Sequence, residues 1–150
     1  MKRLQLSESD RERLQSGPVT VRRAAGLADV NEHPTAWRLH NVGPLGYMAK
    51  KSVKGRWGAT FDCWPESPVR PPDAGGDLLV CPCLAPFTPG EVVYVPEGWC
   101  RGLTKVLYKI DWHHNDFMHW RPAASMPAWA VRLHARCVSV AAVKGERWEW

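Results

Sequence analysis

The residues best suited to recognise a ligand lie at the end of Pro89–Trp99, PGEVVYVPEGW. Val92–Val95 are β-branched and aromatic residues that favour a strand, and Pro96, which cannot donate to a ladder, ends that strand or places it at a sheet edge. A carboxylate, Glu97, and a large ring, Trp99, follow directly. Binding sites are commonly built where a rigid strand delivers polar and aromatic groups. We therefore expect Glu97 and Trp99 to line a binding site.

Arg22 and Arg23 form a second set of candidate ligand residues. Ser7 and Asp10 resemble a capping box, which predicts a short helix of about two turns in this part of the chain. Val19–Val21 then predict the start of a strand that leads into the two arginines. Guanidinium groups suit phosphate, so this pair favours a phosphate contact. The alternative is a solvated pair of surface arginines.

Metal ligation is a weaker hypothesis. The chain has five cysteines, and an odd number without a signal peptide argues against a disulfide framework. Cys81-Pro-Cys83 is spaced more closely than the paired ligands of a zinc knuckle. Cys81, Cys83 and Cys100, with His113 or His114, would make a four-ligand set if the fold brought them together. Reduced, partly buried thiols are the favoured reading, and we expect neither a metal nor another cofactor.

Length and charge limit the classes of function. A chain of 150 residues predicts a single domain, spanning residues 1–150, with one core. The N-terminus has no apolar signal core, and no apolar run is long enough to cross a membrane, which predicts a cytoplasmic protein without a membrane partner. The net charge of +5 favours a polyanion as partner. Nine tryptophans add rings that gather at binding faces as well as in cores.

Short strands separated by turn signals indicate an α+β fold that is mainly β, a small mixed barrel with one or two short helices beside it. The strands are expected at Trp57–Phe61, Leu78–Cys81, Glu91–Val95, Thr104–Asp111 and within Ala130–Val143, with a loop at Pro65–Gly76. We expect Glu91–Val95 to pair with Thr104–Asp111 across the intervening turn. Trp148 and Trp150 are expected to fold back onto the body.

Three segments resemble the ASCH family (activating signal cointegrator homology), especially its phage and prophage members described as morphogenetic proteins. PGEVVYVPEGW is similar to the family's PGDxLWVRETW, and Trp120–Arg132, WRPAASMPAWAVR, is similar to WRPSxHMPxWASR. Ser16–Arg23 is a weaker match to GRKTxTRR. The resemblance implies a PUA-like fold, with a groove between the first helix, the following strand and the barrel that holds RNA or a nucleobase-like ligand.

Carried over by motif, the resemblance implies one set of ligand-binding residues. They are Thr20, Arg22, Arg23, Glu97, Trp99, Trp120, Arg121, Trp129 and Arg132. Arginines would meet phosphate, rings would stack on bases, and Glu97 would accept from a base's exocyclic amine. Family members that hydrolyse acetylated cytidine use a lysine where this chain has Gly17 or Pro18. A hydroxyl and a carboxylate without that cation form a poor nucleophile.

These observations predict a non-catalytic module for RNA, another single-stranded nucleic acid or a modified nucleoside. The first alternative is a small hydrolase acting on a modified nucleoside or RNA, in which Thr20 and Glu97 would be the catalytic residues. The second is a protein–protein interaction module in phage biology that uses the tryptophan-rich surface.

Overall fold

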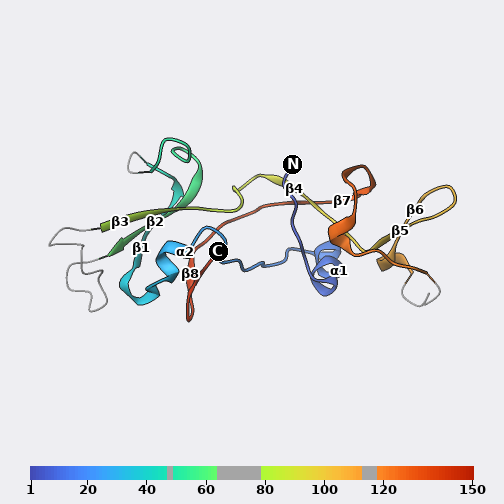
Figure 1. Cartoon of the computed structure of the whole chain (residues 1–150), viewed down its shortest axis with the longest axis horizontal. Coiled ribbons are helices and arrows are strands. Elements are labelled where there is room, and N and C mark those ends of the chain that lie inside the picture. Colours follow the sequence, from blue (N-terminus) through green and yellow to red (C-terminus); the bar gives the residue numbers. More distant parts are fainter. Residues whose placement is uncertain (47–48, 64–78, 113–117) are drawn as a thin grey trace. The chain divides into compact units, whose positions relative to one another are not determined.

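The computed structural model describes residues 1–46, 49–63, 79–112 and 118–150, and the predicted loop at Pro65–Gly76 lies outside them (Figure 1). The helices (α), 3₁₀ turns (η) and strands (β) are, in chain order, α1 (Glu8–Ser16), α2 (Ala28–Asn31), η1 (Pro34–Ala36), β1 (Arg38–Pro44), β2 (Trp57–Cys63), β3 (Leu79–Leu84), β4 (Val92–Val95), β5 (Trp99–Arg101), β6 (Val106–Tyr108), η2 (Lys109–Asp111), η3 (Ala123–Ser125), η4 (Ala128–Ala130), β7 (Leu133–Arg136), β8 (Val143–Lys144) and β9 (Trp148–Glu149). The fold is α+β and mainly β, as the sequence predicts.

The chain divides into two compact units, and each is built from separate stretches of sequence. The first unit contains Met1–Val21 and Glu91–Cys137, and the second contains Arg22–Gly90 and Val138–Trp150. Neither unit is a continuous half of the chain, because each is completed by residues far away in sequence. The single domain expected from the chain length stays a prediction.

The second unit is organised by β2, which lies between β1 and β3 in an antiparallel sheet. Ala59 and Phe61 of β2 are fully buried, as expected for the alternating strand predicted there. β3 does not end before Pro82, where the sequence placed its end, but continues to Leu84 with Pro82 opposite Thr60. The reason is that β3 is an edge strand of the described sheet. Pro82 has no N–H to donate, and an edge strand tolerates such a residue because one of its sides has no neighbouring strand to bond.

The C-terminal tail completes the core of this unit, which confirms the predicted fold-back. Trp148 and Trp150 are buried, and the Trp148 ring meets the Phe61 ring edge-to-face at 4.9 Å between centroids. Both indole N–H groups are satisfied: Trp148 Nε1 donates to the Pro34 carbonyl at 3.1 Å and Trp150 Nε1 to the Ala25 carbonyl at 2.7 Å. Burying these rings with their polar atoms paired avoids the desolvation penalty of an unmet donor.

In the first unit, β4 pairs with β7, and β5 forms a hairpin with β6. The expected pairing of Glu91–Val95 with Thr104–Asp111 is therefore wrong. The strand within Thr104–Asp111 is taken by β5, its nearer neighbour across a short turn, while Val93 of β4 lies opposite Ala135 of β7. A short loop costs less closure entropy, which favours the local hairpin.

The N-terminal helix begins where the sequence indicates and ends at Ser16. The Ser7 hydroxyl accepts from the Asp10 backbone N–H at 3.0 Å, and the Gly17 N–H donates to the Arg13 carbonyl at 3.0 Å. Val19–Val21 is not a strand, contrary to expectation. A β-branched run forms a strand only where a partner strand completes its ladder. Val19–Val21 lie where the chain leaves the first unit, and no strand of the described chain pairs with them there.

The described strands form four separate sheets rather than one closed barrel. Their order is β1-β2-β3, β4-β7, β5-β6 and β8-β9. Within the residues described, no helix has the length and apolar character needed to span a membrane.

Candidate functional site

The pairing of β4 with β7 brings Glu97 beside Arg132. Val95, the last residue of β4, lies opposite Leu133, the first residue of β7. The chain just after β4 therefore runs alongside the chain just before β7, and these two stretches hold Glu97 and Arg132. Two residues assigned to the ligand set by the ASCH resemblance thus belong to one site.

Arg132 lies between two carboxylates and bonds to both in a bidentate manner. Its Nε and Nη2 donate to the Glu97 carboxylate at 3.0 and 3.1 Å. Its Nη1 and Nη2 donate to the Asp111 carboxylate at 2.7 and 3.1 Å. The planar guanidinium fork matches carboxylate geometry, so these are among the stronger charge-assisted hydrogen bonds of a protein.

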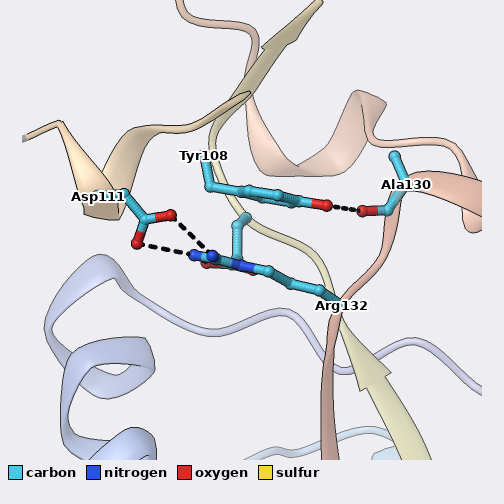
Figure 2. Close-up of polar contacts among 5 residues, drawn as sticks. Tyr108, Asp111, Ala130 and Arg132 are labelled. Atoms are coloured by element: carbon cyan, nitrogen blue, oxygen red, sulfur yellow. Dashed lines mark hydrogen bonds and ion pairs between the residues drawn. The ribbon is translucent and has the colours of Figure 1, made fainter. Parts of the chain in front are cut away.

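Tyr108 covers the face of the same guanidinium. The Arg132 Cζ atom lies 3.9 Å from the centroid of the Tyr108 ring, within cation–π range. The Tyr108 hydroxyl donates to the Ala130 carbonyl at 2.7 Å, which fixes the ring (Figure 2). We call the four side chains of Glu97, Tyr108, Asp111 and Arg132 the Arg132 cluster.

The cluster is unevenly buried. The Glu97 side chain is 2% exposed, whereas those of Arg132 and Asp111 are 38% and 50% exposed. The hydrogen bonds that Glu97 accepts, with a smaller contribution from those to Asp111, raise the pKa of Arg132 above its ordinary value. The guanidinium therefore stays charged and neutralises a carboxylate that water does not reach. A buried carboxylate persists only when it is paired in this way.

Glu97 thus has a structural partner that the sequence did not reveal. Both of its oxygens accept from Arg132, so this carboxylate holds the cluster, and its expected contact with a base stays a prediction. Thr20, the other residue of the hydrolase alternative, is exposed and is not a hydrogen-bond partner of Glu97. The structure does not join these two residues in a nucleophile–base arrangement.

Two exposed indoles flank the backbone that the cluster fixes. Trp112, which follows Asp111 directly at the end of η2, is 44% exposed, and Trp129 in η4 is 70% exposed. The residue after Trp129 is Ala130, whose carbonyl holds Tyr108. Trp112 is therefore next to a member of the cluster, and Trp129 is next to a residue that the cluster holds by a hydrogen bond. Rings on an anchored backbone lose little freedom when a flat ligand stacks on them.

Trp99 is placed differently from these two rings. It is 5% exposed, packs with Met126 and Ala130, and donates from Nε1 to the Ser125 hydroxyl at 3.2 Å. The Arg121 guanidinium lies 5.1 Å from the centroid of its ring system, and the two backbones bond to each other. Trp99 is a core residue of the first unit and leaves little ring surface for a base. Trp120, which shares the Trp120–Arg132 segment with Trp129, is half-buried.

The two arginines after α1 belong to a different compact unit from the Arg132 cluster. Arg22 and Arg23 belong to the second unit, whereas Thr20 belongs to the first. Arg23 makes a two-way backbone pair with Trp150, donating at 3.2 Å and accepting at 2.7 Å. This pair ties the segment to the buried C-terminal tail. The proposed phosphate role of the two arginines stays a prediction.

Of the suggested zinc set, Cys81 and Cys83 lie together. Alternate residues of a strand share a face, and Cys81 Sγ and Cys83 Sγ on β3 are 3.8 Å apart. Their hydrogen bond lowers the pKa of Cys81 and, with burial, raises that of Cys83. Cys100 is in the first unit, and His113 and His114 lie outside the described residues. Among residues the structure describes, no three His, Cys, Asp or Glu side chains are grouped to hold a metal ion.

Tyr108 and Asp111 were not among the site residues predicted from the sequence. Both were assigned to one predicted strand, but β6 ends at Tyr108 and the chain turns through η2, which carries Asp111 toward Arg132. The sequence held no local signal for this contact, because Arg132 is 38% exposed and an exposed arginine does not need a carboxylate partner.

Comparison of the chain with protein-family models, with curated proteins and with solved structures gives no match. The resemblance to the ASCH family is therefore carried by the three sequence segments alone and stays a prediction.

Proposed function

We propose that this chain is a non-catalytic module of the PUA-like, ASCH type that binds single-stranded nucleic acid, RNA in the first instance, by stacking bases on Trp112 and Trp129. The observation that carries the proposal is the attachment of these two exposed rings, 44% and 70% exposed, next to residues held by the Arg132 cluster. Single-stranded nucleic acids are commonly bound by aromatic rings that stack on bases beside a positively charged surface.

The charge of the chain supports the same ligand. The net charge of +5 attracts a polyanion. Arg121, within the Trp120–Arg132 segment, contributes to this charge and is exposed above the Trp99 ring. Cations near stacking rings are the arrangement that binds a phosphate backbone without reading its sequence. A modified nucleoside presents the same flat ring without the backbone charge.

The hydrolase alternative is less well supported because both oxygens of Glu97 are engaged by Arg132. The protein-interface alternative uses the same exposed indoles, since tryptophan is enriched among the residues that dominate protein interfaces. Salt distinguishes the two partners. Nucleic-acid binding weakens steeply as salt rises because neutralised phosphates release counterions. An apolar protein interface does not show this dependence.

The test compares a variant that removes the ring of Trp129 with one that replaces it by a smaller ring. Fluorescence anisotropy of a short labelled single-stranded RNA should show that Trp129→Ala weakens binding by about 5- to 150-fold, the loss expected for one stacked base. Trp129→Phe should keep most of the affinity because it retains a ring. Val138→Ala, which trims a side chain that is 79% exposed in the second unit, is the control and should bind like the wild type. Equal affinity of Trp129→Ala and the wild type would rule out stacking on this ring.

A further inference from the structure

The loop between β5 and β6 carries an apolar side chain that lies entirely in solvent. Leu103 has a relative exposure of 106%, the highest among the exposed large hydrophobic residues of the described chain. The Gly102 N–H donates to the Lys105 carbonyl at 2.9 Å, which leaves Leu103 and Thr104 as the two residues at the tip of the hairpin. Single exposed apolar residues are common, so the surroundings of Leu103 must supply the argument.

The hairpin that carries Leu103 is held at both its tip and its base. A Cβ atom at Gly102 would lie 2.7 Å from the Lys105 carbonyl oxygen and 3.4 Å from Leu107 Cγ, so the turn is closed tightly. At the base, Trp99 pairs with Tyr108, which belongs to the Arg132 cluster. A tip on such a support loses little conformational freedom on binding.

The tip of the hairpin is also positively charged. Arg101 and Lys105 flank the tip, both are exposed, and the hairpin from Trp99 to Tyr108 contains no carboxylate. Neither cation has an ion-pair partner among the residues that the structure describes. An apolar side chain between two cations is the chemistry by which proteins wedge against base pairs while holding the neighbouring phosphates.

We propose that this hairpin contacts the end of a duplex next to the bound single strand, with Leu103 packed on the last base pair and Arg101 and Lys105 on the flanking phosphates. The inference rests on the proposed function and names its substrate class, an RNA junction between duplex and single strand. At a junction the last base pair is already unstacked on one face. An apolar side chain can therefore cover that face without separating two base pairs.

The experiment compares one labelled single strand with the same strand attached to an RNA stem-loop. The wild type should bind the stem-loop form about tenfold more tightly than the strand alone, the gain expected when most of a leucine side chain is removed from water. Leu103→Ser should lose most of this gain, keeping the part that Arg101 and Lys105 supply, and should keep its affinity for the strand. Thr104→Ala, at the same tip, should behave like the wild type. For Arg101→Met/Lys105→Met binding to the stem-loop form, the slope of the logarithm of the binding constant against the logarithm of the salt concentration should be shallower by about 2.

Each outcome separates the inference from the proposed function. Equal wild-type affinity for the strand and the stem-loop form would overturn the inference and leave the function intact. No binding to either RNA would overturn both. Binding to phosphatidylserine–phosphatidylcholine vesicles that exceeds RNA binding and depends on Leu103 would overturn the inference in favour of a membrane surface.

Discussion

Replacing Arg132 by methionine tests whether the buried Glu97 carboxylate depends on one cation. Methionine keeps an apolar stem but removes the guanidinium and with it every hydrogen bond to the two carboxylates. Asp111, which is 50% exposed, can be hydrated after the change. Glu97, which is 2% exposed, cannot, so its charge is left unpaired in the interior.

The expected loss follows from this difference in burial. Removing one partner of a fully buried ion pair destabilises a protein by about 3–5 kcal/mol. Arg132 is 38% exposed, so water screens part of this interaction and the loss should be smaller. We expect Arg132→Met to lower the free energy of unfolding by about 2–4 kcal/mol, with the lost cation–π contact to Tyr108 included.

Urea unfolding followed by circular dichroism measures this loss. Lys109→Met is the control in the same unit, because the ion pair of Lys109 with Glu8 has side chains 47% and 49% exposed and should contribute at most about 1 kcal/mol. The double variant Glu97→Met/Arg132→Met should be more stable than Arg132→Met alone, since it no longer buries an unpaired charge. The reasoning is refuted if Arg132→Met is no less stable than Lys109→Met, or if the double variant recovers nothing.

Two further predictions concern the second unit. Gly58→Ala should lower the free energy of unfolding by about 1–3 kcal/mol, because the new methyl would collide with the Cys83 carbonyl oxygen and lie 2.9 Å from Leu45 Cδ2. Gly17→Ala, where nothing lies within 4 Å, is the control, and equal effects of the two changes on urea unfolding would show that this site is not tightly packed. Cys81 should be alkylated by iodoacetamide before Cys83, because their hydrogen bond lowers the pKa of Cys81 and raises that of Cys83, and the thiolate is the nucleophile. Peptide mass spectrometry after a timed reaction at neutral pH checks this order, and earlier labelling of Cys83 would contradict it.

The elements that the sequence predicted well depend on local chemistry. Val92–Val95 form a strand because their side chains suit a pleated surface and Pro96 stops the ladder. The first helix begins directly after Ser7 because the Ser7 hydroxyl accepts from the Asp10 N–H, which has no partner within the helix. Trp148 and Trp150 return to the core because two large rings cannot remain in water without loss of hydrophobic stabilisation.

Strand pairing was harder to predict because it depends on residues that are distant in sequence. The composition of Val92–Val95 fits several partners equally well, and nothing local selects β7 over β6. The same difficulty hid the partner of Glu97. Arg132 was included only through the ASCH resemblance, and Asp111 was not identified at all, because their contact arises from the turn after Tyr108. Sequence patterns report which residues are buried, whereas the partner of a buried charge is set by the tertiary fold.

Nucleic-acid binding is tested by tryptophan fluorescence of the wild-type chain, titrated with short single-stranded RNA at low and at moderate salt. We expect quenching, because bases stack on Trp112 and Trp129, and an affinity that falls as salt rises. Arg121→Met should flatten the salt dependence by about one unit of the logarithmic slope. No quenching at low salt, or an affinity that does not change with salt, would contradict the claim that this chain binds nucleic acid.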